Sequence, residues 1–232
     1  MKTPEYLRSL QVSFQECANT ENALQMKKYM KNRCDFFGIK SPLRKEIYRE
    51  HKQKYGLIPK EDTAEIVKWC WQQPQREYQY FAMEFLGKTA KKEDGGIIDL
   101  YVYLITNKSW WDTVDFIASN LVGVYLKRFP DKTEQLTAEW IASENMWLQR
   151  TCLLFQLKYK SELNTELLHQ FIGQLSSSNE FFIRKAIGWI LREYSKTNAE
   201  FVVSYVEKYP LSGLSQREAL KWLKNNFRHS KL

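Results

Sequence analysis

The feature that most constrains the fold is a short pattern that recurs along the chain. In four segments an arginine is followed five residues later by an aromatic residue: Arg76 and Phe81, Arg150 and Phe155, Arg184 and Trp189, and Arg217 and Trp222. A further copy, between the first two, has Asp112 in place of the arginine, and successive copies are 36, 38, 34 and 33 residues apart. Repeats of about 30–45 residues that each form a helix pair are typical of α-solenoids. The sequence therefore predicts a stack of helix pairs.

The spacing of the apolar residues predicts helices almost throughout. Apolar residues recur every three or four positions in segments such as 63–72, 76–88 and 165–175, which is the spacing of one helix face. Glycine and proline fall mainly between such segments, as at Pro74 and Pro210, where they interrupt helices. No segment alternates for long enough to predict a strand. We expect a single all-α domain over residues 1–232, with roughly twelve helices.

The charge of the chain indicates an anionic partner. The sequence has 35 lysines and arginines against 27 acidic residues, a formal net charge of +8. The excess lies at the two ends, because residues 1–60 carry a net +7 and residues 151–232 a net +5, whereas residues 61–150 carry −4. Two basic arms suit a polyanion, and nucleic acid is the leading candidate. Eight tryptophans and an aromatic content of 15% indicate that some rings act outside the core.

Several other classes of protein are disfavoured. No apolar run approaches the ~18–20 residues of a membrane span, and Pro4, Glu5 and Arg8 interrupt the N-terminal stretch that a signal peptide would need. The four cysteines and three histidines are too scattered to predict a zinc site or a disulfide framework. We therefore expect a cytoplasmic monomer without metal or cofactor.

The arginine of each repeat predicts a row of guanidinium groups. If the second helix of each pair lines a concave face, Arg76, Arg150, Arg184 and Arg217 would form a row along it. Arginine binds phosphate in a bidentate manner, so we expect part of the row to contact a phosphate backbone. The alternative for each arginine is an ion pair with the neighbouring repeat.

The segment Lys108–Phe116 departs from the row, because two tryptophans precede an acidic residue in the arginine position. Ser109 and Asp112 have the spacing of a capping box, which predicts that Ser109 caps a helix and that Asp112 reaches back to it. Asp115 follows Trp111 by four residues and so shares its helix face. A carboxylate in a basic groove repels phosphate, so it indicates either catalysis on a substrate that develops positive charge or an ion pair with an arginine such as Arg150.

At these residues the chain resembles the AlkD family of bacterial DNA glycosylases, which are HEAT-like-repeat enzymes that excise alkylated purines. The Trp-Trp-Asp-Thr-Val-Asp motif at positions 110–115 is fairly specific. The resemblance extends in order over nearly the whole chain, through the stretches 27–32, 108–115, 147–160 and 181–194.

The resemblance implies a right-handed, curved α-solenoid of HEAT-like repeats with a basic concave face. It also implies that Trp111, Asp115 and Trp189 form the active site, although the repeat alignment alone would make Trp189 a core aromatic. Arg150 would be the nearby phosphate contact. Further contacts to DNA are expected from Tyr29, Lys40, Lys158, Arg184, Arg192 and Arg217.

The expected activity is hydrolysis of the N-glycosidic bond of N3- and N7-alkylated purines in double-stranded DNA. No lysine adjoins Asp115 within the motif, so we expect no strand cleavage. Two alternatives remain open from the sequence. One is a member of the family that binds damaged or branched DNA without excising a base, and the other is a repeat scaffold that binds a protein partner.

Overall fold

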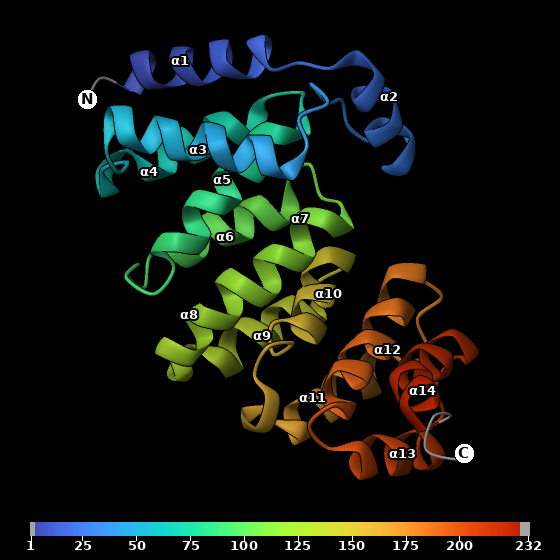
Figure 1. Cartoon of the computed structure of the whole chain (residues 1–232). Helices are drawn as coiled ribbons and strands as arrows, with labels where there is room; N and C mark the ends of the chain where they lie inside the picture. The colour runs from blue at the N-terminus through green and yellow to red at the C-terminus, as the bar shows by residue number, and fades with distance from the viewer. Residues whose placement is uncertain (1–2, 228–232) are drawn as a thin grey trace. The chain divides into compact units, whose positions relative to one another are not determined.

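The computed structural model describes residues 3–227, which form helices and connecting loops (Figure 1). Over these residues there is no strand, and only an isolated bridge joins Asp35 and Gln75. The prediction of an all-α fold is therefore confirmed. The described residues contain fourteen α-helices, somewhat more than expected, in part because a π-helical turn divides one helix into α7 and α8. The helices form two compact units, Met1–Thr89 and Ala90–Leu232, and a single domain stays a prediction.

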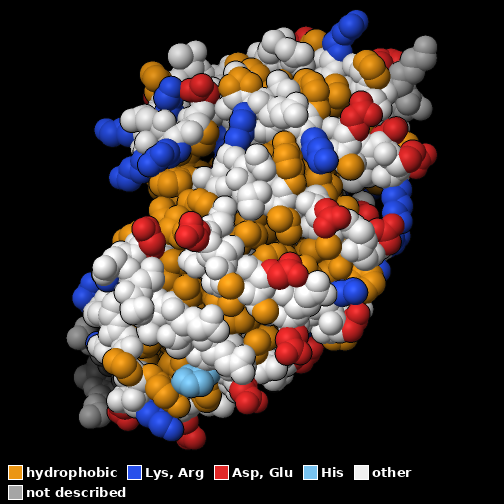
Figure 2. Space-filling model, turned by 180° about the vertical axis from the view of Figure 1, so that it is seen from behind, with side chains coloured by type: hydrophobic (Ala, Val, Ile, Leu, Met, Phe, Trp, Pro, Cys, Tyr) orange, Lys and Arg blue, Asp and Glu red, His pale blue; other side chains and the backbone are white. Residues whose placement is uncertain are grey.

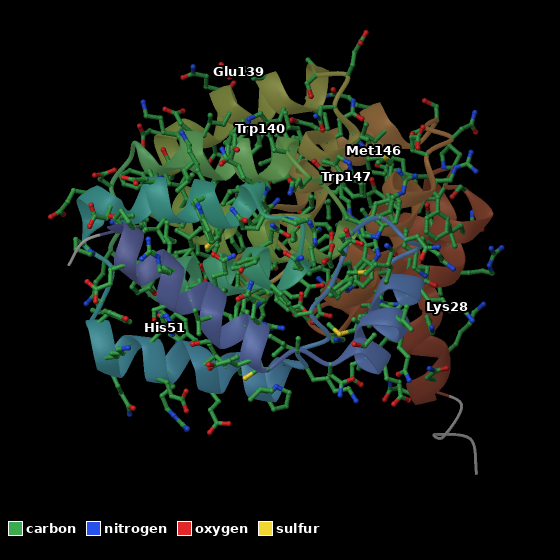
Figure 3. All side chains as sticks on the ribbon, turned by 90° about the horizontal axis from the view of Figure 1, so that it is seen from above. Lys28, His51, Glu139, Trp140, Met146 and Trp147 are labelled. Carbon is green, nitrogen blue, oxygen red and sulfur yellow. The ribbon has the colours of Figure 1, made fainter. Side chains whose placement is uncertain are left out.

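The first unit has an aromatic core. Its helices are α1 (Thr3–Glu16), α2 (Thr20–Tyr29), α3 (Ser41–Tyr55), α4 (Lys60–Gln72) and α5 (Arg76–Thr89). Phe14 of α1 lies 5.0 Å from Tyr78 and 6.1 Å from Phe81, measured between ring centroids. The buried ring of His51, labelled in Figure 3, meets the edge of Tyr6 at 5.4 Å. These rings join α1, α3 and α5, because each helix contributes its apolar face to the same cluster.

A buried carboxylate shapes the loop that leads into α3. Both oxygens of Glu77 accept hydrogen bonds from the backbone N–H groups of Phe37, Gly38 and Ile39, at 2.9–3.1 Å. Gly38 has a φ of +90°, and a Cβ there would lie 2.0 Å from the carbonyl oxygen of Asn19. Only glycine fits this close turn, so Glu77 and Gly38 together set the backbone that precedes Lys40.

The second unit contains the helices from Ile97 onwards. They are α6 (Ile97–Thr106), α7 (Trp111–Phe116), α8 (Gly123–Arg128), α9 (Thr133–Ala142), α10 (Met146–Leu154), α11 (Thr165–Leu175), α12 (Phe181–Ser195), α13 (Ala199–Lys208) and α14 (Gly213–Phe227). A π-helical turn, Ile117–Val122, joins α7 to α8. Figure 2 shows one face of the molecule, on which hydrophobic side chains reach the surface among charged ones.

The sequence repeat coincides with helix pairs. The five copies of the repeat lie on α5, α7, α10, α12 and α14, each of which follows a partner helix in the chain. Packing between neighbours such as α4 and α5, or α9 and α10, connects each pair. The prediction of a helical repeat architecture is confirmed, whereas the curvature and a basic concave face stay predictions.

The helices α12 and α14 approach each other closely at Gly188. A Cβ at this position would lie 2.5 Å from the Cβ of Glu218 and 2.7 Å from the carbonyl oxygen of Ser215. The hydroxyl of Ser215 also donates a hydrogen bond of 2.8 Å to the carbonyl of Arg184. A side chain at position 188 would therefore separate the two helices.

In the part of the chain that is described, no helix is long and apolar enough to span a bilayer.

This contact predicts a specific cost for a single methyl group. We expect Gly188→Ala to lower the free energy of unfolding by about 1–3 kcal/mol, because the added Cβ overpacks a tight interface. Gly173→Ala is the matched control, since Gly173 lies in α11 with nothing near its Cβ position, and alanine favours helix there by up to about 1 kcal/mol. Urea unfolding measures both changes. Equal stability of the two variants would contradict the interpretation.

Candidate active site

The helix that carries Asp115 begins differently from the sequence prediction. The structure places Trp110 at the N-cap of α7, with no side-chain capping hydrogen bond from that residue. The hydroxyl of Ser109 instead donates to the carbonyl of Ile105 at 2.6 Å. The predicted capping role of Ser109 is wrong, because its hydroxyl satisfies the last turn of α6 rather than the first turn of α7.

A π-helical turn follows α7 directly. The hydroxyl of Ser119 donates to the carbonyl of Asp115 at 2.8 Å, and the side-chain amide of Asn120 donates to the carbonyl of Phe116 at 2.9 Å. These two hydrogen bonds satisfy backbone oxygens where the helical pattern changes. Turns of this kind within α-helices are frequent at functional sites, and this one lies immediately after the helix that presents Asp115.

Asp115 and Arg150 form a bidentate ion pair between α7 and α10. Arg150 Nε lies 2.7 Å from Asp115 Oδ1, and Arg150 Nη2 lies 2.9 Å from Asp115 Oδ2. The third nitrogen, Nη1, donates to the backbone carbonyl of Phe182 on α12. The side chains of Arg150 and Asp115 are only 3% and 13% exposed. The guanidinium group therefore connects three helices and fixes the plane of the carboxylate.

Burial dominates the ionisation of this carboxyl group. Loss of solvent raises the pKa of Asp115 above its ordinary value of 3.8, although the hydrogen bonds and charge of Arg150 lower it and Asp112 raises it further. The pKa shift in this direction means that the low-dielectric surroundings outweigh the cation. A carboxylate in such surroundings acts on a nearby positive charge more strongly than one in water.

Phe182, whose backbone carbonyl accepts from Arg150, belongs to a cluster of three aromatic rings. The ring centroids of Trp110, Trp147 and Phe182 lie 5.0–5.9 Å apart. Trp147, labelled in Figure 3, comes from α10, so the cluster contains one ring from each of α10, α12 and the start of α7. The centroid of the Phe182 ring also lies 5.8 Å from the guanidinium carbon of Arg150, so the ring helps to shield the guanidinium group from water.

A pocket of about 350 Å³ opens beside the ion pair. Its lining combines indole and phenyl rings with one carboxylate and three cations. The residues are Trp111, Asp115, Arg150, Phe181, Phe182, Lys185, Trp189 and Arg192. The structure thus brings together the three residues predicted to be catalytic, with two of the arginines predicted to bind DNA.

The sequence prediction missed three residues of this lining. Phe181, Phe182 and Lys185 belong to the same helix as Trp189 and Arg192. Positions 182, 185, 189 and 192 follow the three- and four-residue spacing of one helix face. That spacing, counted outwards from Trp189, is the signal that would have found Phe182 and Lys185.

Lys185 and Arg192, the two other cations of the pocket lining, form ion pairs with the same carboxylate, that of Glu218. Lys185 Nζ lies 2.6 Å from Glu218 Oε1, and Arg192 Nη1 lies 2.6 Å from Glu218 Oε2. Burial would raise the pKa of Glu218, but the hydrogen bond and charge of Lys185 and the charge of Arg192 lower it overall. The carboxylate of α14 therefore stays ionised between the two cations of α12.

Comparison with known proteins identifies the family of the chain. The family described as DNA alkylation repair enzyme matches residues 10–223, which is most of the sequence. The chain belongs to this DNA alkylation repair enzyme family. The resemblance to AlkD-like proteins inferred from the motif is thereby confirmed. Membership of a DNA repair family implies that the chain binds DNA.

Solved structures agree with the family. A predicted DNA alkylation repair enzyme from Enterococcus faecalis has 33% identity and a TM-score of 0.82, covering 89% of this chain and 96% of the other. AlkD2 from Streptococcus mutans has 19% identity and a TM-score of 0.58, covering 85% and 96%. The smu.31 protein of Streptococcus mutans UA159 has 18% identity and a TM-score of 0.56, covering 78% and 94%. The last two show the same fold. No curated protein matches the chain significantly.

The contact of the predicted arginine row with phosphate stays a prediction, although two of its four arginines are buried. The side chains of Arg76 and Arg150 are buried, at 2% and 3% exposure, because each lies on the packed face of its helix. Arg184 is half-buried and donates from Nε to the carbonyl of Ser178 at 2.8 Å. Only Arg217 is exposed among the four. The four arginines therefore do not form a row of exposed guanidinium groups.

The remaining predicted DNA contacts lie outside the pocket. Tyr29 and Lys40 are exposed in the first unit, at the end of α2 and immediately before α3. Lys158 is exposed in the second unit, and its ammonium group donates to the side-chain oxygen of Asn120 in the π-helical turn. Their roles in binding DNA stay predictions.

Within residues 3–227 no group of three His, Cys, Asp or Glu side chains is arranged to hold a metal ion.

The opposite pKa shifts of two carboxyl groups predict opposite effects of pH on stability. The pKa of Asp115 is raised, so the cost of burying its charge is present at neutral pH and disappears as the pH falls through the folded pKa towards 3.8. The pKa of Glu218 is lowered, so its contribution is present above 4.5 and is lost as the pH falls through the folded pKa.

Acidification should therefore raise the free energy of unfolding of the wild type relative to Asp115→Asn, and lower it relative to Glu218→Gln. Urea unfolding of the three proteins at several values between about pH 3 and pH 7 measures both differences. Two trends of the same sign would contradict the opposing assignments.

Proposed function

We propose that the chain is a DNA glycosylase that hydrolyses the N-glycosidic bond of N3- and N7-alkylated purines in duplex DNA. The observation that carries the proposal is the position of Asp115. Its carboxylate, held in plane by Arg150, lies in one pocket with the indoles of Trp111 and Trp189. Membership of the DNA alkylation repair enzyme family supports the same conclusion.

The chemistry of these lesions explains why so few catalytic groups suffice. A purine alkylated at N3 or N7 carries a formal positive charge, so it departs as a neutral base and needs no general acid. As the glycosidic bond breaks, positive charge moves to the deoxyribose in an oxocarbenium-like transition state. The site therefore needs a fixed negative charge near the sugar and a surface that accepts a cation.

Asp115 meets the first requirement. Arg150 occupies one lone pair on each carboxylate oxygen, and an ionised carboxylate can accept about four hydrogen bonds. The remaining lone pairs are available to orient the attacking water or to face the sugar. Since the group is already oriented, its stabilisation of the developing charge requires little reorganisation and is worth a few kcal/mol.

The aromatic residues meet the second requirement. Trp111 and Trp189 both line the pocket, and an indole face attracts a cation by about 0.5–2 kcal/mol. This attraction favours a cationic lesion over an unmodified, neutral purine. The phenyl rings of Phe181 and Phe182 extend the apolar lining, which excludes water and strengthens every charge interaction within the site.

Arg150 has two possible partners under this proposal. Three of its five N–H groups donate within the protein, to Asp115 and to Phe182. The predicted contact with phosphate would use the remaining two. Because the side chain is almost fully buried, we assign its main role to orienting Asp115.

Base release from alkylated DNA tests the proposal. We expect wild-type protein to release N7-methylguanine from duplex DNA, and Asp115→Asn to slow release by about 10²–10³-fold, the usual effect of removing one preorganised electrostatic group. Asp112→Asn is the matched control, because Asp112 lies on the same helix but does not line the pocket, and it should retain most activity. A well-folded wild type that releases no base would contradict the glycosylase, and full activity in Asp115→Asn would contradict the mechanism.

The fate of the abasic product forms a second test. The motif around Asp115 contains no lysine, but the fold brings Lys185 into the pocket. Lys185 Nζ forms an ion pair of 2.6 Å with Glu218, and an ion-paired ammonium group cannot attack the sugar aldehyde. We therefore expect no strand incision and no protein–DNA adduct on borohydride reduction. Efficient trapping would show that the enzyme is also a lyase.

A second candidate function is DNA binding without excision. It is favoured by the ion pair itself, because a carboxylate paired with a buried arginine is also the arrangement of a structural contact. This candidate predicts tight binding to alkylated duplex without release of base. The release assay, run beside a binding assay on the same duplex, separates the two functions.

A further inference from the structure

Two cations flank Trp189 on the pocket face of α12. Lys185 precedes the tryptophan by four residues and Arg192 follows it by three, so all three side chains project from one side of the helix. All three line the same pocket. Lys185 has no role in the excision chemistry proposed above, and its place beside the indole therefore calls for another explanation.

One carboxylate fixes both cations. Each oxygen of Glu218 accepts from a different partner, Lys185 or Arg192, at 2.6 Å, and the Glu218 side chain is only 12% exposed. Gly188 allows this approach, since a Cβ there would collide with that of Glu218. A rigid contact between α12 and α14 thus sets the separation between the ammonium and guanidinium groups.

The cluster keeps a positive charge that can reach a ligand. The two cations, Lys185 and Arg192, and the carboxylate of Glu218 together carry a net charge of +1. The side chains of Lys185 and Arg192 are 37% and 24% exposed, so both remain open to solvent at the pocket. Ammonium and guanidinium groups in this state bind phosphate oxygens through charge-assisted hydrogen bonds.

We propose that Lys185 is a DNA phosphate contact that acts together with Arg192, and that Glu218 is a positioning residue for both. The inference rests on the proposed glycosylase function. Lys185 Nζ and Arg192 Nη1 each lie 2.6 Å from one oxygen of the same carboxylate, so the two charged groups are close enough to contact neighbouring phosphates of one DNA strand. The two cations therefore match phosphates on either side of the nucleotide that faces Trp189.

Salt dependence of binding tests the role of Lys185. We expect Lys185→Gln to reduce the slope of log K against log salt concentration by about one for a duplex containing N7-methylguanine, because one fewer phosphate is neutralised. Lys127→Gln is the matched control. Lys127 has a similar exposure, 39%, and pairs with Glu162 at 2.8 Å, but it does not line the pocket.

The control should keep the wild-type slope. An unchanged slope in Lys185→Gln, or an equal loss in both variants, would overturn the proposed contact. Wild-type protein that binds duplex DNA but releases no base would contradict the glycosylase alone, because this test measures binding without excision. Failure of the wild type to bind duplex DNA would overturn both.

Excision at saturating DNA tests the role of Glu218. We expect Glu218→Gln to slow single-turnover release by about ten- to a hundredfold, as misplaced contacts do, with the salt slope unchanged because both cations remain. Glu162→Gln is the control and should leave the rate unchanged. Loss of thermal stability at a wild-type rate would show a merely structural role. Tighter binding to undamaged DNA at a wild-type rate would show that Glu218 masks the cations, and either result would overturn the positioning role.

Discussion

The candidate site depends on one buried ion pair. The guanidinium group of Arg150 binds both oxygens of Asp115 and the backbone carbonyl of Phe182, so it connects helices that are distant in sequence. Removing one partner of a buried pair leaves an uncompensated charge, which typically costs about 3–5 kcal/mol. The helices α7, α10 and α12 must therefore pack correctly before the carboxylate reaches the pocket. The same contacts that stabilise this part of the fold also fix the geometry proposed for catalysis.

Helix α12 organises the other half of the site. Its pocket face carries a phenyl ring, an ammonium group, an indole and a guanidinium group in succession: Phe182, Lys185, Trp189 and Arg192. Beside this face, α12 approaches α14 at Gly188 too closely for any side chain. Close packing against α14 holds α12 in a defined position, as is required of a helix whose side chains contact a sugar and its flanking phosphates.

The sequence was sufficient for the fold class and for the centre of the site. The repeat predicted the helix pairs, and helical spacing placed Trp111 and Asp115 on one face. Their grouping with Trp189 in one site was implied by the family resemblance. The sequence was insufficient where a side chain can bind either a local or a distant partner. Ser109 bonds back to α6 rather than capping α7. The ion pair of Asp115 with Arg150 was one of two alternatives left open by the sequence, and spacing did not predict that it is buried. Neither outcome follows from spacing, since each depends on how separate helices pack.

Lys185 shows a different limit of sequence reasoning. Helical spacing from Trp189 places Lys185 on the pocket face of α12, but spacing does not distinguish a ligand-binding lysine from a solvated one. Its significance comes from the carboxylate of Glu218, 33 positions further along the chain, and from the shared pocket. Long-range pairs of this kind become visible only when the helices are placed together.

The proposed catalysis requires that Arg150 acts through Asp115, and a double-mutant cycle tests this coupling. The single-turnover release of N7-methylguanine would be measured for wild type, Asp115→Asn, Arg150→Gln and the double variant. If Arg150 serves mainly to orient the carboxylate, the double variant will be scarcely slower than Asp115→Asn alone, because residues that act as a unit are not additive. If the two losses multiply, Arg150 acts independently of Asp115, and its proposed orienting role is wrong.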